Sequence, residues 1–219
     1  MPTLFAAAEL SLWIAVMHGG GAVLQFSSVI LAFLASVFFF KKNTSVISTE
    51  TALLFTVLAD LCLVILNPIR QLPAMLFFSI TQISYAVRLY NEESNPERKK
   101  YHVVLRIILC TALEASMLMA LRSQADALTA ITMFYFANLA SNAYFAFKAG
   151  KSRLFAIGLL LFIACDLFVG LNVLFSDYLF INESGMLYEI INPPFNAVWF
   201  FYIPSQTLIA LSAYSLSQK

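Results

Sequence analysis

Four acidic side chains lie inside long apolar stretches of the sequence: Glu9, Asp60, Glu114 and Asp166. A carboxylate is costly in a hydrocarbon environment, so such a residue usually faces the interior of a helix bundle and serves a function. Two carboxyls in one dry site cannot both ionise cheaply, so one keeps its proton near neutral pH and can act as an acid while the other acts as a base. A pair of these acids would therefore be suited to proton-transfer chemistry.

Asp60 and Asp166 are the candidates for such a pair because both fall near the middle of their stretches. Asp60 is ten residues beyond position 50, where its stretch begins, and Asp166 is twelve residues beyond position 154. At 1.5 Å per helical residue, both carboxyls would lie about 15–18 Å deep. We expect them to turn inward and meet in one water-accessible chamber. The alternative is that each only forms a hydrogen bond to a neighbouring helix.

Amide and phenol side chains on two other stretches complete the predicted pocket. Gln82 and Tyr85 are three residues apart, and Tyr202 and Gln206 are four residues apart. At these spacings each pair shares one face of a helix. Both pairs reach a depth similar to that of the two aspartates, so we expect them to position substrate and water.

The remaining polar residues in the apolar stretches are weaker candidates. Asn138 and Asn142, four residues apart, either line the pocket or tie helices together. Glu114 and Arg106, eight residues apart on one helix face, belong either to the pocket lining or to a structural charge network. Glu9 is expected to be only partly buried. The sequence contains no cluster of cysteines and histidines, so we expect no metal and no cofactor.

The composition predicts that these residues are held by helices in a membrane. The chain is 61% hydrophobic and 11% charged, with a mean hydropathy of +0.82, whereas soluble domains are about 45–50% apolar and about 25% charged. A net charge of +1 argues against a nucleic-acid partner. A membrane helix needs about 20 apolar residues. Eight stretches approach that length: 3–18, 22–40, 50–67, 71–89, 102–121, 126–147, 154–175 and 194–214. We therefore expect one all-α, polytopic membrane domain over residues 1–219.

The distribution of basic residues predicts how this bundle is oriented. With eight spans, ten of the thirteen Lys and Arg residues fall on the side that holds the N-terminus: Lys41, Lys42, Arg88, Arg98, Lys99, Lys100, Lys148, Lys151, Arg153 and Lys219. Cytoplasmic loops carry this excess. We therefore expect both termini in the cytoplasm and an acidic outer connector over 176–194. The short loops and the lack of an import signal favour a bacterial inner membrane, and a eukaryotic endomembrane is the alternative.

A weak internal similarity also links the two halves of the chain. Residues 53–61 read LLFTVLADL and residues 160–167 read LLFIACDL, so Asp60 and Asp166 follow similar apolar segments. Two phenylalanines then precede Gln82 and Gln206. This pattern predicts a parallel repeat of two four-helix halves. The alternative is chance similarity between apolar helices rich in Phe and Leu.

Four short motifs resemble those of the YhhN-like membrane proteins, which include lysoplasmalogenases. The family pattern has Gly-Asp-x-x-Leu, then His-x-x-Tyr, then Ser-Asp, and finally Tyr-x-x-Ala-Gln-x-Leu-Ile. The matching segments lie in this order within residues 50–215, and they are ADLCL at 59–63, QISY at 82–85, CD at 165–166 and YIPSQTLI at 202–209. The departures are an alanine for the glycine, Gln82 for the histidine, Cys165 for the serine and Ser205 for the alanine.

The resemblance implies an eight-helix hydrolase that cleaves the vinyl ether bond of an ether-linked lysophospholipid and releases a fatty aldehyde. One of Asp60 and Asp166 would donate a proton and the other would act as the base, while the amide and phenol groups orient water and the ether oxygen. Gln82 can orient water but cannot transfer a proton as a histidine can. The alternative is a catalytically silent protein of the same fold that binds or transports lipid.

Overall fold

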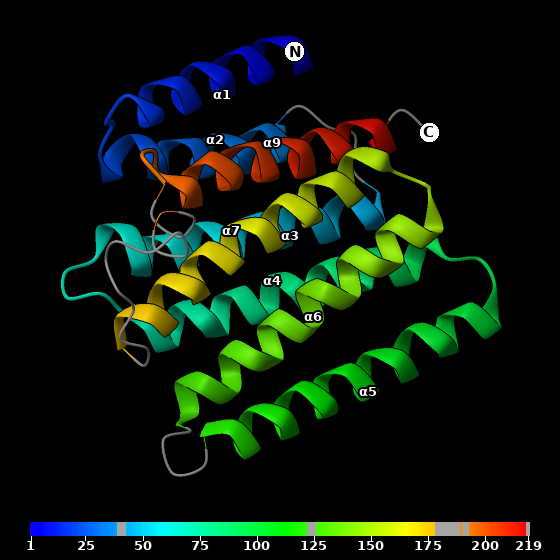
Figure 1. Cartoon of the computed structure of the whole chain (residues 1–219). Helices are drawn as coiled ribbons and strands as arrows, with labels where there is room; N and C mark the ends of the chain where they lie inside the picture. The colour runs from blue at the N-terminus through cyan, green and yellow to red at the C-terminus, as the bar shows by residue number, and fades with distance from the viewer. Residues whose placement is uncertain (39–42, 122–125, 178–188, 190–192, 218–219) are drawn as a thin grey trace.

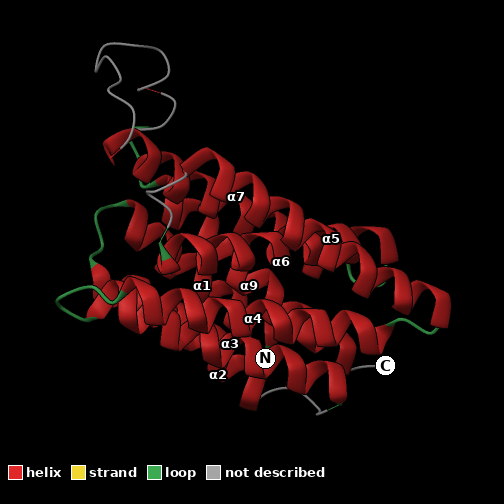
Figure 2. Ribbon diagram, turned by 90° about the horizontal axis from the view of Figure 1, so that it is seen from below, coloured by secondary structure: helices red, strands yellow, loops and turns green. Residues whose placement is uncertain are grey.

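The computed structural model describes residues 1–38, 43–121, 126–177, 189 and 193–217, and its regular structure there is entirely helical (Figures 1 and 2). The all-α prediction is therefore confirmed. Each predicted stretch overlaps one helix. The predicted acidic connector, including Glu183, lies mostly outside the described residues, as do Lys41, Lys42 and Arg122. Within the described residues the α-helices are α1 (Pro2–Met17), α2 (Ala22–Phe38), α3 (Thr44–Asp60), α4 (Gln71–Glu92), α5 (Pro96–Leu121), α6 (Ala127–Ala149), α7 (Arg153–Asp177) and α9 (Ala197–Ser217).

Several of these helices have the length and composition of membrane spans. Three described segments are long and apolar enough to cross a bilayer, namely Thr44–Ile65, Gln71–Glu92 and Arg153–Val173. The helices Pro2–Met17 and Ala22–Phe38 are apolar but shorter. The described chain is thus a helical protein of membrane type, while the count of eight spans and the cytoplasmic termini stay predictions.

The distribution of polar residues fits the same class. Large apolar side chains lie on the outer surface; Leu4 and Phe147 are each 70% exposed. Polar side chains such as Arg88, Asn142 and Gln206 are fully buried inside the bundle. A protein surrounded by lipid needs this arrangement, because its apolar surface contacts hydrocarbon and its polar groups find partners in the interior.

Two helices begin earlier than the apolar stretches predict. The helix expected from residue 50 begins at Thr44, where Asn43 Oδ1 accepts a hydrogen bond of 2.9 Å from the Val46 N–H. The helix expected from 102 begins at Pro96, where Asn95 Oδ1 accepts one of 2.9 Å from the Glu97 N–H. Side-chain acceptors of this kind satisfy the free N–H groups of a first turn, and proline is well suited to that turn. The hydropathy pattern locates the apolar part of a helix, whereas the caps set its first residue.

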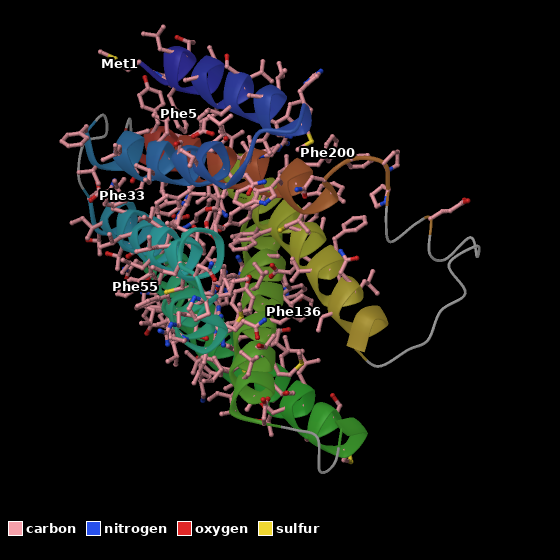
Figure 3. All side chains as sticks on the ribbon, turned by 90° about the vertical axis from the view of Figure 1, so that its left-hand side faces the viewer. Met1, Phe5, Phe33, Phe55, Phe136 and Phe200 are labelled. Atoms are coloured by element: carbon pink, nitrogen blue, oxygen red, sulfur yellow. The ribbon has the colours of Figure 1, made fainter. Side chains whose placement is uncertain are left out.

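The helices pack around a centre made by α3, α4, α6, α7 and α9. The closest pairs are α3 with α4 and α7 with α9, and α6 packs against α4. At one edge α1 docks on α9, where Trp13 Nε1 donates a hydrogen bond of 3.1 Å to the carbonyl of Phe200 (Figure 3). At the opposite edge α5 packs against α6 (Figure 1). The predicted repeat of two halves remains untested.

Arg88 joins three helices of this centre. It is 0% exposed, and its Nε donates a hydrogen bond of 2.9 Å to Glu92 of the same helix. Its Nη1 donates to Thr49 of α3 at 3.1 Å and to Ser212 of α9 at 2.8 Å. The guanidinium also lies 3.8 Å from the centroid of the Phe155 ring on α7. Arg88 therefore fixes how α3, α4 and α9 meet.

The substitution Arg88→Met is expected to lower the free energy of unfolding by about 3 kcal/mol, because it leaves buried polar partners without their cation. Unfolding of the purified protein by a denaturing detergent measures this change. The control is Arg70→Met, which removes the same charge from an exposed position. Equal stability of the two variants would contradict the structural role of Arg88.

Candidate functional site

Asp60 lies at the end of α3, just before a short π-helical turn, Leu61–Ile65. Such turns shift the register of a helix and are frequent at functional sites. The Asp60 carboxyl is 3% exposed, and its Oδ2 accepts a hydrogen bond of 2.7 Å from the hydroxyl of Tyr202 on α9. The contact joins residues 142 positions apart in the sequence.

Asp166, on α7, is partly buried and has a tyrosine partner of its own. Its Oδ2 accepts a hydrogen bond from the hydroxyl of Tyr135 on α6. Tyr135 is not among the predicted pocket residues, because no motif marks it in the sequence. A usable signal was present, since Tyr135, Asn138 and Asn142 recur at spacings of three and four on one face of α6.

The two carboxyls lie in the same region of the bundle. Asp60 and Asp166 are close enough to interact electrostatically, and Tyr135 interacts with both. The Phe162 ring lies between the two phenols, with its centroid 6.3 Å from that of Tyr135 and 5.4 Å from that of Tyr202. The site is asymmetric, because Tyr202 comes from the last helix and Tyr135 from α6. In both carboxyls Oδ1 receives no hydrogen bond from a described residue.

Gln206 and Tyr85 place further polar atoms in the core. Gln206 is 0% exposed, and neither atom of its amide has a hydrogen-bond partner among the described residues. Gln206 lies one helical turn from Tyr202 on α9, and Thr56 lies one helical turn from Asp60 on α3. The buried Tyr85 hydroxyl is near Thr56 but forms no well-aligned hydrogen bond with a described residue. Buried polar atoms without protein partners usually contact bound water, so these residues mark a space that can hold it.

Gln82 points to α6 and not to either carboxyl. Its Oε1 accepts a hydrogen bond of 3.0 Å from Asn142 Nδ2, which also donates to the Gln82 backbone carbonyl at 2.8 Å. Its Nε2 has no partner among the described residues. Asn142 thus ties α6 to α4, which was one of its two predicted roles, and leaves Gln82 with one free donor group.

Arg106 and Glu114 form no hydrogen bond or ion pair with each other in the described part of the chain. The Arg106 guanidinium instead donates hydrogen bonds of 2.9 Å to Asn138 Oδ1 and 2.8 Å to Asn142 Oδ1. Among the described residues no carboxylate forms an ion pair with it. Eight helical residues correspond to about 12 Å, which is too far for direct contact. Glu114 is half-buried and forms no hydrogen bond to the site residues in the described part of the chain.

Glu9 forms a separate buried contact. Against expectation it is only 1% exposed, and its Oε2 accepts a hydrogen bond of 2.5 Å from Ser28 on α2. The contact lies between α1 and α2, away from the aspartates. In the described residues no three His, Cys, Asp or Glu side chains come together as a metal site would require.

Comparison with known proteins gives one result. The model of the YhhN family matches residues 21–213, which covers most of the chain and includes Asp60, Asp166, Tyr135 and Tyr202. The searches of curated proteins and of solved structures found no match. The match extends well beyond half of the 219 residues. The chain therefore belongs to the YhhN family.

Proposed function

We propose that this protein is an intramembrane hydrolase that cleaves the vinyl ether bond of a lysophospholipid and releases a fatty aldehyde and a glycerophospho-alcohol. The observation that carries the proposal is that Asp60 and Asp166 are each held by a tyrosine hydroxyl inside the bundle, near enough for the charge of Asp166 to act on Asp60. Such a pair can keep one proton and one negative charge in a site sheltered from bulk water. Family membership supports the same chemistry.

The first step uses the protonated carboxyl. That aspartic acid donates its proton to the vinyl carbon remote from the ether oxygen, and the adjacent carbon–oxygen unit becomes an oxocarbenium ion. The second, ionised carboxylate lies close enough to stabilise this positive charge. Tyr135 and Tyr202 hold one oxygen of each carboxyl. The other oxygen of each is left for the substrate or for water.

The second step uses water. A water molecule attacks the oxocarbenium carbon, and the ionised carboxylate accepts its proton, so that the two carboxyls exchange roles. The resulting hemiacetal breaks into the aldehyde and the alcohol, and a proton passes between oxygens without net loss. The unpaired amide of Gln206 and the hydroxyl of Tyr85 are suited to hold the water. Gln82 contributes a free N–H donor but transfers no proton.

The proposal includes a location and a path for the substrate. We place the protein in a bacterial inner membrane with eight spans and both termini in the cytoplasm, as the basic residues suggest. The lipid enters from the bilayer, and its chain lies among apolar side chains while the ether bond reaches the aspartates. The chemistry described needs no cofactor.

Aldehyde release from a matched substrate panel tests this function. Purified protein is incubated with a lysophospholipid that carries a vinyl ether chain, and with saturated ether and ester analogues of the same chain length and head group. We expect aldehyde from the vinyl ether lipid alone, because only its double bond can accept a proton at carbon. Absence of aldehyde with every vinyl ether head group tested would reject the hydrolase.

Lipid binding without hydrolysis is the second candidate function. The observation that favours it is Gln82, which stands where the family pattern has a histidine and whose carbonyl oxygen is occupied by Asn142. In this case the panel would yield bound lipid but no aldehyde. The two candidates also differ in the substitutions considered in the Discussion, since lipid binding alone does not require proton transfer.

A further inference from the structure

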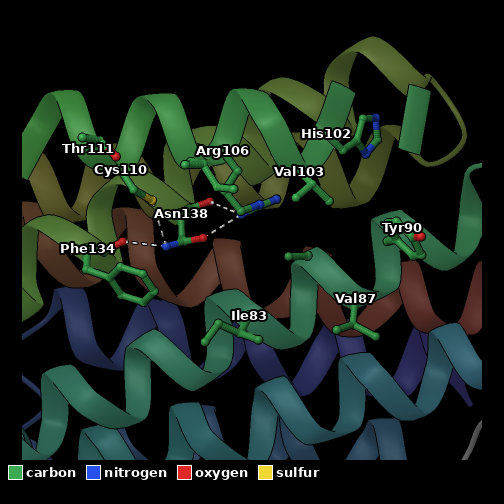
Figure 4. Close-up of a pocket in the computed structure, with 12 residues that line it drawn as sticks. Ile83, Val87, Tyr90, His102, Val103, Arg106, Cys110, Thr111, Phe134 and Asn138 are labelled. Atoms are coloured by element: carbon green, nitrogen blue, oxygen red, sulfur yellow. Dashed lines mark hydrogen bonds between the residues drawn. The ribbon is translucent and has the colours of Figure 1, made fainter. Parts of the chain in front are cut away.

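A cavity of about 450 Å³ opens on the side of the bundle, between α4, α5 and α6 (Figure 4). It is separate from the aspartate pair, because α4 and α6 pack closely against each other between the two. Its volume lies in the range of about 300–1,000 Å³ that is usual for small-molecule sites. Its walls include Ile83, Val87, Tyr90, Val103, Ile107 and Phe134.

The cavity opens on the outer surface of the bundle and not into its core. In the described residues α5 packs extensively against α6 alone, which leaves α4 and α5 apart. The lining side chains Ile83, Val87, Tyr90, Val103 and Ile107 are between 43% and 60% exposed. In a membrane helix bundle, apolar surface of this kind is in contact with hydrocarbon chains. A lipid can therefore enter sideways without any rearrangement of the helices.

Arg106 places a positive charge in this apolar wall. Its Nη1 donates a hydrogen bond to Asn138 (Figure 4), and its Nη2 donates one to Asn142. Its Nε–H and one Nη2–H have no acceptor among the described residues, and no described carboxylate balances the charge. A guanidinium presents its Nε–H and one Nη2–H on the same edge, and this fork fits two oxygens of a phosphate. A guanidinium without a counter-ion is costly in apolar surroundings, so binding of an anion beside Arg106 is favourable.

A second cation lies at one end of the cavity. Lys99 Nζ is 4.7 Å from the centroid of the Tyr90 ring, and Tyr90 lines the cavity. Arg106 follows Lys99 by seven residues, about 10 Å along the helix. At the opposite end the lining residues Cys110, Thr111 and Phe134 carry no formal charge, and Glu114 lies one turn beyond Cys110 on α5. The cavity thus has a cationic end and an apolar end, as a single-chain amphiphile with an anionic head group requires.

We propose that this cavity binds a phospholipid from the surrounding bilayer, with its phosphate on the free edge of the Arg106 guanidinium and its chain along Ile107 and Phe134. The hydrogen bonds from Arg106 to Asn142 and from Asn142 to Gln82 connect this lipid site to the core. The site does not depend on the hydrolase activity, because it is separate from Asp60 and Asp166.

The test measures binding of two chain-matched probes to the full-length protein in detergent micelles by native mass spectrometry. The probes are palmitoyl lysophosphatidylcholine, which carries the phosphate and has no vinyl ether to hydrolyse, and palmitoylglycerol, which lacks the phosphate. We expect the phosphate-bearing probe to bind about tenfold more tightly, which corresponds to about 1.4 kcal/mol. In Arg106→Gln this preference should disappear, and in Arg106→Lys it should be reduced because the fork is lost.

Two further variants separate binding from folding. Ala86→Trp fills the cavity from α4 and leaves the Arg106 hydrogen bonds intact, so it should block the same probe. Arg70→Gln removes a charge elsewhere and should bind like the original protein. Equal affinity for the two probes, or unchanged binding in both Arg106→Gln and Ala86→Trp, would overturn the proposal. Displacement of the lipid probe by millimolar inorganic phosphate would also overturn it, since it would indicate a site for soluble phosphate.

Discussion

Asp60→Asn and Asp166→Asn should each reduce aldehyde release from a vinyl ether lysophospholipid by about 10²–10⁴-fold, the range typical of a lost general acid or base. Asparagine has nearly the shape of aspartate, and its carbonyl oxygen can still accept the hydrogen bond from Tyr202 or Tyr135. The bundle should therefore stay folded and still bind lipid. Turnover rates and melting temperatures, measured on the same preparations, check both parts of this expectation.

Glu9→Gln is the matched control for these two substitutions. Glu9 is also a buried acid with a hydroxyl partner, but it lies between α1 and α2. Its loss should leave turnover unchanged. If Glu9→Gln were as inactive as the aspartate variants, the loss of activity would reflect general damage to buried carboxyls. Full activity in either aspartate variant would remove that residue from the mechanism.

The double variant Asp60→Asn/Asp166→Asn tests whether the two acids act as a unit. When two groups cooperate in one proton-transfer step, removal of either one abolishes most of the rate enhancement that they provide together. The fold-reduction in activity of the double variant is then smaller than the product of the two single reductions. We expect the double variant to be nearly as active as the poorer single variant. A loss equal to the product of the two single losses would indicate independent roles and would argue against the exchange of one proton between them.

The helices were predictable because their signal is physical and local. A segment that crosses hydrocarbon must be apolar over about 20 residues, and each of the eight stretches overlaps a described helix. The starts of α3 and α5 were not predictable at this level, because Asn43 and Asn95 cap turns that are too polar to count as apolar stretch. The expectation that Glu9 is only partly buried was also wrong, because its burial against Ser28 depends on how α1 packs against α2.

The two acids of the site were predictable from the sequence, whereas the residues that form hydrogen bonds with them were less so. Asp60 and Asp166 stand out because ionisable residues are rare in apolar helices. Which side chain reaches each acid depends on tertiary packing, and this is why Tyr202 was anticipated as a pocket residue and Tyr135 was not. The same dependence on tertiary packing explains why the partners of Arg106 were not predicted. Spacing on one helix suggested Glu114, whereas the closer packing of α5 on α6 supplies Asn138 and Asn142.

A substitution at Tyr135 tests a role that only the structure predicts, because no sequence motif marks this residue. Tyr135→Phe removes only the hydroxyl that donates to Asp166 and keeps the ring that packs against Phe78 and Phe162. A hydrogen bond to a charged group contributes about 1.5–3 kcal/mol. If that interaction is made in the transition state, its loss lowers kcat by about 10–100-fold.

The expected pattern for Tyr135→Phe is a lower kcat with an unchanged KM, since the hydroxyl holds a reacting carboxyl and does not contact the lipid chain. Tyr144→Phe serves as the control, because Tyr144 is 43% exposed on the same helix and should be neutral. Steady-state aldehyde release at several lipid concentrations separates the two parameters. A raised KM at constant kcat would place Tyr135 in lipid binding, and unchanged kinetics would mean that the hydrogen bond to Asp166 plays no part in turnover.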